Sequence, residues 1–600
     1  MDMHISNRYA GGLPKVGLRP VVDARQMSGA RLKCENTTIE LCKNISKLIN
    51  GKLRYPNGSP VECAISPIGI SGVTEAEECA DYFRKNGVGV SITVAITWCY
   101  AAETIDLDPM TPKCAIGMNN SDGSGAVYLA ALQAAHNQFG LPCFSIYGKD
   151  VLHMSETSLR PDCEDRLLRF VKAAVAASYL RGKTYLSVGS VSMGIAGSMV
   201  DEAFFRTYLG MRTQMMDMSE LTRRIEGGIY DKAEYGKAKK FIEERFRFGK
   251  DYNPPETRLS QDRKAASWDT TIKMALIFKD MMIGNKKLAE QGHPEEAVGY
   301  NAIAAGFQGQ RHWTDFMPVG DLHEAMLNSS FDWSGIRQPL IVATENDSLN
   351  SVAMLFGNLL TGSAQVFADI RTYWSPQSVF EGTGYSLTGR AADGIIHLAN
   401  SGPAALDGCG ASMKDGKPVI KPFWEMTEND VRACLESVEW CPAETLSFSG
   451  TGYHTRFRTK GEMPVTLMRV NIVKGIGPTM QIAEGHIVDL PQEIHDALDM
   501  RTSPAWPTSW FVPRTTGEGA FKDVYTLMSK WGANHGAFSY GHIGADVITL
   551  CSILRIPVGL HNIGSDDIFR PTAWDSFGTQ NPEGSDLSAC TYYGPIYGKY

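Results

Sequence analysis

Short apolar runs alternate with longer amphipathic stretches along almost the whole 600-residue chain. Runs at 15–19 (KVGLR), 89–94 (GVSITV) and 143–147 (CFSIY) have the length and composition of buried strands. The stretch 166–180 has helical length and composition and precedes another strand-like run at 185–191. Alternation of this kind predicts an α/β fold with mostly parallel sheets.

The chain is too long for one hydrophobic core, since single cores stop growing near about 250–300 residues. Length alone allows two to four domains, and no repeat or low-complexity tract divides the sequence. A new strand begins after residue 180, and a strand–helix unit ends near 360. We therefore expect an N-terminal α/β domain at 1–180 and a second α/β domain at 181–360, followed by a C-terminal mixed domain at 361–600.

Composition excludes several classes of protein. The 58 Lys and Arg residues against 66 Asp and Glu give a net charge of −8 without a basic stripe, which argues against nucleic-acid binding. No run reaches the roughly 18 apolar residues that cross a bilayer, and the first residues do not resemble a secretory signal. The 13 cysteines form no C-x-x-C pair, which favours buried reduced thiols. We expect a cytoplasmic protein.

The segment 338–374 is the most informative part of the chain. It is expected to form a strand at 339–344, a helix capped by Ser348, and a second strand at 365–368. Parallel neighbouring strands lie about 4.8 Å apart. Glu345 and Asp369 would then end adjacent strands and share the crevice where α/β proteins bind ligands. Two such acids repel unless a cation lies between them; alternatively, they are helix caps or solvated loop residues.

Three further stretches contain polar groups with two possible uses. His535 lies in the glycine-rich stretch 531–536 (WGANHG), and a single histidine is often structural. With two carboxylates it would form a mainly oxygen-rich set suited to Mn²⁺, although spacing does not connect it to Glu345. The stretch 187–197 (SVGSVSMGIAG) suits close packing at a strand–helix junction or an anion cradle. The stretch 306–313 (GFQGQRHW) suits a polyol pocket or a polar turn.

The chain resembles the bacterial L-fucose isomerases along essentially its whole length. The matching stretches share one order, and they include 16–23 (VGLRPVVD), 189–197 (GSVSMGIAG), 300–313 (YNAIAAGFQGQRHW), 343–350 (ATENDSLN), 367–376 (FADIRTYWSP) and 531–536 (WGANHG). The resemblance implies a Mn²⁺-dependent aldose–ketose isomerase. It also implies a three-domain subunit and a homohexamer, with a small aldose or ketose as the substrate.

The resemblance assigns roles position by position. Glu345, Asp369 and His535 would hold the metal, and Glu345 and Asp369 would also transfer the protons. The positions that match the sugar site are Arg19, Gln308, Ser401, Trp506 and Asn534. Trp98 matches a tryptophan that the family contributes from a neighbouring subunit, so that the site would need the oligomer.

The implied reaction interconverts L-fucose and L-fuculose through a metal-held cis-enediol, with direct hydride transfer as the open alternative. D-arabinose and D-ribulose would also react. L-fucose and D-arabinose share their configuration at C2, C3 and C4, and the terminal methyl that distinguishes them is worth only about 1 kcal/mol in an apolar pocket.

Three departures from the family concern substrate preference, and one of them is the loop at 119–125 (NNSDGSG). Residues 94–104 read VAITWCYAAET, where the family has a TPCWCYGSET-like string, and Ser447 replaces a tyrosine, for which Tyr453 could substitute. The alternatives are therefore an isomerase for another aldose and a catalytically silent sugar-binding hexamer. The intact set Glu345, Asp369 and His535 argues against the second.

Overall fold

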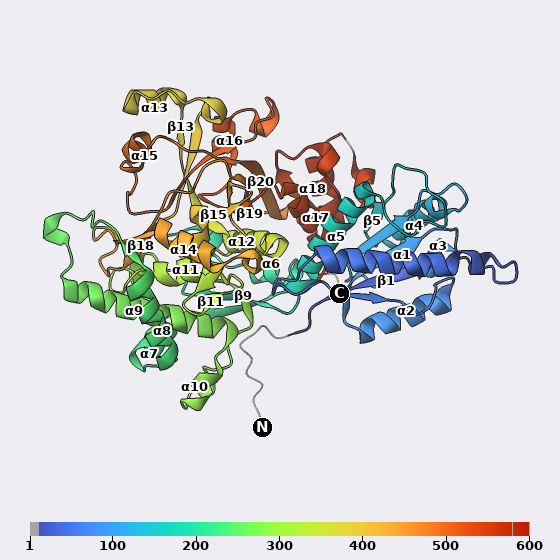
Figure 1. Ribbon diagram of the computed structural model, residues 1–600, viewed down its shortest axis with the longest axis horizontal. Helices are drawn as coiled ribbons and strands as arrows, with labels where there is room; N and C mark the ends of the chain where they lie inside the picture. The colour runs from blue at the N-terminus through green and yellow to red at the C-terminus, as the bar shows by residue number, and fades with distance from the viewer. Residues whose placement is uncertain (1–10, 579, 599–600) are drawn as a thin grey trace.

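The computed structural model describes residues 11–578 and 580–598, which form three sheet-centred regions (Figure 1). The N-terminal region contains a five-stranded parallel sheet in the order β2-β1-β3-β4-β5. Its strands are β1 (Lys15–Val21), β2 (Cys63–Ile65), β3 (Val88–Ala95), β4 (Lys113–Gly117) and β5 (Cys143–Ile146). Its helices are α1 (Ala30–Lys52), α2 (Val73–Lys85), α3 (Ala101–Thr104), α4 (Gly125–Phe139) and α5 (Pro161–Leu180). The strand-like runs at 15–19, 89–94 and 143–147 are confirmed as β1, β3 and β5.

The second region contains a four-stranded parallel sheet in the order β12-β9-β6-β7. Its strands are β6 (Thr184–Val188), β7 (Arg212–Met216), β9 (Ala302–Phe307) and β12 (Ile341–Ala343). Its helices are α6 (Glu202–Thr207), α7 (Met218–Glu226), α8 (Lys232–Arg245), α9 (Gln261–Ile283), α10 (Lys286–Glu290) and α11 (Asp321–Asn328). Both N-terminal regions therefore have the predicted parallel α/β architecture.

The C-terminal region is built on a mostly antiparallel sheet in the order β19-β22-β13-β14-β21-β20-β23. Because β19 also pairs with β20, the first six of these strands close into a barrel, and β23 extends β20 in parallel. The strands are β13 (Val366–Trp374), β14 (Ile395–Ala399), β19 (Pro464–Val473), β20 (Gly477–Ile487), β21 (Thr508–Pro513), β22 (His535–Tyr540) and β23 (Val558–Leu560). This barrel with its helices has the predicted mixed character.

Smaller elements complete the fold. The remaining helices are α12 (Ser348–Thr361), α13 (Pro376–Thr383), α14 (Glu428–Ser437), α15 (Gln492–Asp499), α16 (Val524–Lys530), α17 (Gly544–Leu554) and α18 (Pro582–Tyr593). The remaining strands are β8 (Arg247–Phe248), β10 (Phe331–Asp332), β11 (Gly335–Ile336), β15 (Ser412–Lys414), β16 (Lys417–Val419), β17 (Glu439–Pro442) and β18 (Tyr453–Arg456).

The predicted pairing of the strands on either side of α12 is wrong. β12 belongs to the second sheet, whereas β13 belongs to the barrel. α12 is buried along its whole length except at Thr361, and it packs against β9 and β12 of the second sheet and against β19 and β22 of the barrel. A helix that is buried on all sides needs partners on several sides, so α12 connects two sheets instead of returning to one.

The predicted helix cap is wrong by one residue. The side chain that caps α12 is that of Asp347, whose Oδ1 accepts a hydrogen bond from the Asn350 amide at 3.0 Å. Ser348 is the first helical residue, and its hydroxyl donates to the Gly197 carbonyl at 2.8 Å.

The cysteine prediction is confirmed. In the described part of the chain every cysteine is a free thiol, and all of them are buried except Cys63, which is half-buried. Within the same residues, none of the helices combines the length and the apolar character needed to span a bilayer.

Candidate active site

Glu345 lies in a strained turn between β12 and α12. Its φ is 58° and that of Asn346 is 50°, so two consecutive non-glycine residues adopt the left-handed region. Such backbone costs of order 1–3 kcal/mol per residue and is concentrated at functional sites. The Asn346 side chain maintains the turn, since it donates to Ser187 Oγ at 2.9 Å and accepts from Tyr185 Oη at 3.0 Å.

Asp369 and His535 lie directly opposite each other on antiparallel strands β13 and β22. Asp369 was expected at the end of a strand, but β13 continues to Trp374. The antiparallel register, and not a shared parallel edge, therefore places this carboxylate. Side chains that face each other across such a pair have Cβ atoms about 4.5–5.5 Å apart.

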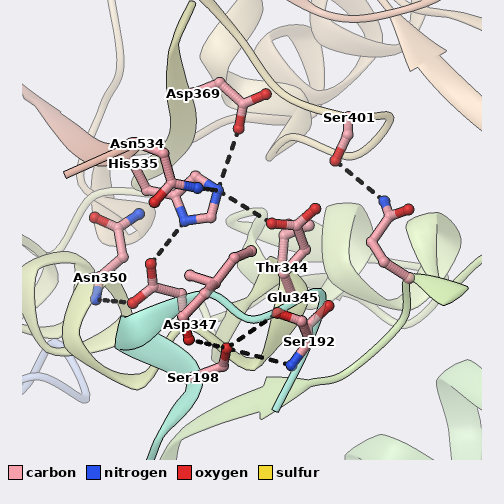
Figure 2. A network of polar contacts seen from close by, with 12 residues as sticks. Ser192, Ser198, Thr344, Glu345, Asp347, Asn350, Asp369, Ser401, Asn534 and His535 are labelled. Atoms are coloured by element: carbon pink, nitrogen blue, oxygen red, sulfur yellow. Dashed lines mark hydrogen bonds and ion pairs between the residues drawn. The ribbon is translucent and has the colours of Figure 1, made fainter.

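The two carboxylates converge on one imidazole nitrogen (Figure 2). His535 Nε2 lies 3.1 Å from Glu345 Oε2 and 3.3 Å from Asp369 Oδ1. His535 is 1% exposed, so these contacts are shielded from water. Burial alone would lower the pKa of His535, but hydrogen bonds to Asp347, Asp369 and Glu345 raise it well above its ordinary value.

The donor set fits a hard or borderline divalent cation. Two carboxylates and one imidazole match the oxygen- and nitrogen-rich surroundings that suit Mn²⁺, and a cation would relieve the repulsion between two acids at one point. As the side chains stand they contact one another directly. Among the described residues, no group of three or more His, Cys, Asp and Glu side chains is already arranged to hold an ion. Metal binding would therefore replace the hydrogen bonds to His535 Nε2.

Three of the predicted sugar-site residues lie beside this cluster or are connected to it. Asn534 Nδ2 is 3.0 Å from His535 Nε2. Ser401 is joined through the adjacent Asn400, whose Nδ2 donates to Thr344 Oγ1 at 3.1 Å, next to Glu345. Gln308 accepts from the Ser190 amide at 2.9 Å, and the Ser190 carbonyl in turn accepts from Asn346 Nδ2 at 3.2 Å.

Trp506 approaches the cluster through Arg371. The Arg371 guanidinium lies over the Trp506 ring, 5.2 Å from its centre, and its Nη1 is 3.4 Å from Asp369 Oδ2. Tyr453 has a different environment, because its ring stacks on Trp268 at 4.4 Å. Tyr453 is largely buried in this contact, and its use in place of the family's tyrosine at Ser447 stays a prediction.

Arg19 and Trp98 are not brought to this cluster within one chain. Arg19 lies on β1 in the N-terminal sheet, is 1% exposed, and donates to the Thr104 carbonyl at 2.7 Å. Trp98 is half-buried just beyond β3 of the same sheet. These two residues share the N-terminal region, and Trp98 was expected to act on a neighbouring subunit.

Sequence reasoning missed four residues of the site. Gln310 Nε2 donates to Ser401 Oγ at 3.2 Å, and Asn350 Nδ2 donates to the Gly536 carbonyl at 3.2 Å. Asp347 and Arg469 lie behind His535 and are described below. Gln310 stands in the polar stretch 306–313, so composition was a signal for it, whereas Arg469 lies in a strand and carried no local signal.

Three models of protein domains match the chain in order. They are those of the first N-terminal domain, the second N-terminal domain and the C-terminal domain of L-fucose isomerase, at residues 13–182, 183–362 and 398–561. The matches cover the two parallel α/β regions and most of the barrel. They define an enzyme of the aldose–ketose isomerase class, the intramolecular oxidoreductases of sugars.

Curated relatives agree with these domain matches. An L-fucose isomerase of Bacteroides thetaiotaomicron is 54% identical over 588 residues, which is 97% of this chain and 99% of that protein. An L-fucose isomerase of Vibrio vulnificus is 53% identical over 586 residues, with 98% and 99% covered. One of Streptococcus pneumoniae is 52% identical over 584 residues, with 97% and 99% covered. The chain belongs to the L-fucose isomerase family.

Proposed function

We propose that this protein interconverts L-fucose and L-fuculose, and D-arabinose and D-ribulose, with Mn²⁺ as its cofactor. The observation that carries the proposal is the convergence of Glu345 and Asp369 on His535 Nε2, at 3.1 and 3.3 Å. Membership of the L-fucose isomerase family supports the sugar class. Glu345, Asp369 and His535 would hold the ion. When bound, a divalent cation polarises a sugar carbonyl and makes the adjoining C–H more acidic.

The two carboxylates supply the proton transfers. One accepts the proton from C2 of the open-chain aldose, which leaves a cis-enediolate with its charge on O1. A proton is then returned to C1 while the proton of the C2 hydroxyl passes to O1, so that C2 becomes the ketone and C1 carries the hydroxyl. Glu345 comes from the turn before α12 and Asp369 from β13, so the two acids approach the substrate from different elements. Side chains of Gln308, Ser401 and Asn534 offer hydrogen bonds that orient the hydroxyls.

Isomerisation in D₂O distinguishes proton transfer from hydride transfer. We expect deuterium from solvent at C1 of the ketose formed from an aldose, because a carboxylate exchanges its proton with water between the two steps. NMR or mass spectrometry of the product after many reversible turnovers measures it. A product that remains free of deuterium at C1 after such cycling would contradict the enediol and favour a direct hydride shift.

The proposal includes an oligomer, with a hexamer implied by the family. Trp98 and the exposed Tyr100 follow β3, and the exposed Met27 follows β1, its parallel neighbour. The three residues therefore lie beyond the same edge of the N-terminal sheet. A second copy of the chain that presents this edge to the Glu345–Asp369–His535 cluster would complete a sugar pocket.

Metal removal and restoration test the proposed function. Ketose formation from L-fucose and D-arabinose is expected to disappear after treatment with EDTA and to return with Mn²⁺, because the proposed reaction depends on a cation between the two acids. A colorimetric ketose assay with each sugar checks this. Turnover that is unaffected by complete removal of metal would overturn the metal-dependent proposal.

The departure at 94–104 gives a specific reason to consider a different aldose as the preferred substrate. Mn²⁺ binding without turnover of either sugar would favour that alternative, and a panel of other aldoses would then identify the substrate. Sugar binding without turnover of any aldose would favour the catalytically silent hexamer.

A further inference from the structure

We propose that Asp347 is a positioning residue: it fixes the His535 imidazole so that Nε2 faces Glu345 and Asp369. The inference rests on the proposed function, because it concerns the same metal site. Asp347 is not a member of the cluster itself; it lies on the opposite side of the imidazole (Figure 2).

Hydrogen bonds to both carboxylate oxygens fix the orientation of the Asp347 side chain. Oδ2 is 2.6 Å from His535 Nδ1 and 2.6 Å from Arg469 Nη1. Oδ1 accepts from the amide of Asn350 at 3.0 Å, which is the helix cap of α12. Asp347 is 0% exposed and Arg469 is 2% exposed, so water does not compete for these bonds.

The Asp347 carboxylate determines which nitrogen of the His535 imidazole carries the proton. A carboxylate only accepts hydrogen bonds, so at 2.6 Å the proton must lie on His535 Nδ1. Nε2 is then the nitrogen available to a cation between the two acids. A carboxylate behind a metal-binding histidine fixes the ring and makes the other nitrogen a better ligand, and loss of such a partner typically weakens metal affinity about 10–100-fold.

The negative charge of Asp347 is balanced by groups other than the proposed metal ligands Glu345, Asp369 and His535. Arg469 comes from β19 and neutralises Asp347, while the carboxylate also lies at the positive N-terminal end of α12. The Nε of Arg469 donates to Asn471 Oδ1 at 3.2 Å, on its own strand, which holds the guanidinium in place. Asp347 is therefore held by groups that need not move when the cluster binds an ion.

The glycine-rich stretch 187–197 packs closely against the Asp347–Arg469 pair. A Cβ on Gly197 would lie 2.1 Å from Asp347 Oδ1 and 2.7 Å from Arg469 Nη2, distances that no real Cβ tolerates. Glycine at 197 thus lets the loop close over the Asp347–Arg469 pair. Close packing, and not an anion cradle, is the interpretation of this stretch that the contacts support.

Substitution Asp347→Asn tests the role, with Mn²⁺ affinity measured by calorimetry. The amide keeps the size of the side chain but loses its charge, and we expect the Mn²⁺ Kd to rise about 10–100-fold and kcat to fall at limiting metal while the sugar KM changes little. Asp586→Asn is the matched control. Asp586 lies on α18, away from the site, and is 2% exposed. Its Oδ1 accepts a hydrogen bond from Arg570 Nη1 at 2.6 Å. Both variants remove one buried carboxylate from an arginine pair, so a loss of thermal stability is common to both.

The outcomes separate this inference from the proposed function. Unchanged Mn²⁺ affinity in a folded Asp347→Asn protein, with wild-type protein that binds Mn²⁺, overturns the role of Asp347 alone. Wild-type protein that binds no Mn²⁺ overturns the metal site and this inference with it. An equal loss of affinity in the Asp586→Asn control would assign the effect to general destabilisation and overturn the role.

A second variant covers the case in which Asp347→Asn does not fold. Gly197→Ala retains every polar group but must displace the Asp347 carboxylate, so Mn²⁺ affinity is expected to fall in the same direction. Gly236→Ala is its control, since a Cβ there meets nothing within 4 Å. Equal Mn²⁺ affinity in these two alanine variants would contradict the positioning role.

Discussion

His535→Ala is expected to abolish Mn²⁺ binding and to lower kcat for L-fucose by at least about 10³-fold, equivalent to about 4 kcal/mol of activation free energy. His535 supplies the only nitrogen of the proposed ligand set, and its Nε2 is the group on which Glu345 and Asp369 converge. Without it, the two acids lose the group that lies between them. Calorimetry with Mn²⁺ and ketose assays on the same preparation measure both losses.

His542→Ala is the control for this substitution. His542 lies seven residues further on, and its Nε2 contacts the Gly485 carbonyl at 2.9 Å. We expect this variant to keep its metal and its activity. A His535→Ala protein that binds Mn²⁺ with wild-type affinity, or that isomerises L-fucose as fast as wild type, would refute the ligand assignment.

Glu345→Gln and Asp369→Asn are each expected to lower kcat by about 10²–10⁴-fold, the range for loss of a general acid–base group. The amides preserve the shape of the side chains but cannot accept the C2 proton. The two variants also distinguish the roles of the carboxylates. The variant that lacks the base loses exchange of the C2 hydrogen with D₂O, whereas the other retains exchange but forms little ketose. Proton NMR of the aldose measures this exchange.

Glu324→Gln is the matched control for the carboxylate variants. Burial, with the negative charges of Asp321 and Glu345 adding to it, raises the pKa of Glu324 well above its ordinary value. This shift favours the neutral carboxylic acid, which glutamine resembles in size and charge. Its Oε2 accepts from Thr344 Oγ1 at 2.6 Å, next to Glu345. Activity near wild type in Glu324→Gln would show that a disturbance of the turn at Glu345 does not explain the losses in the other two variants. Full activity in Glu345→Gln and Asp369→Asn would exclude both acids from proton transfer.

Local pattern was sufficient for the parallel regions of the fold. Buried strands such as β1 and β3 are short apolar runs, and their burial on both faces requires no information from distant residues. The same reasoning predicts Glu345 and Asp369 on one sheet, which is wrong. α12 between them is buried on nearly all sides, and the local sequence does not show which surfaces cover it.

The site shows the same division between local and distant information. The segment 338–374 suggested Glu345 as one of two paired acids, with a helix cap or solvated loop residue as the alternative. The left-handed turn that orients Glu345 depends on Ser187 and Tyr185 from β6. Nothing in the local pattern singles out Asp347, because an acid before a helix is ordinarily a cap, which it also is. Its second contact, to His535, joins residues 188 positions apart.

By itself, the sequence determined the α/β class, the chemical types available for a cation site and the family to which the chain belongs. These depend on residue identity and on spacing over a few turns or one strand. Only the tertiary structure decided that Asp369 and His535 face each other across β13 and β22 and that Asp347 and Arg469 stand behind the imidazole. The physical reason is that strand register and helix packing are set by the sum of many weak contacts between distant segments, and no single segment contains that sum.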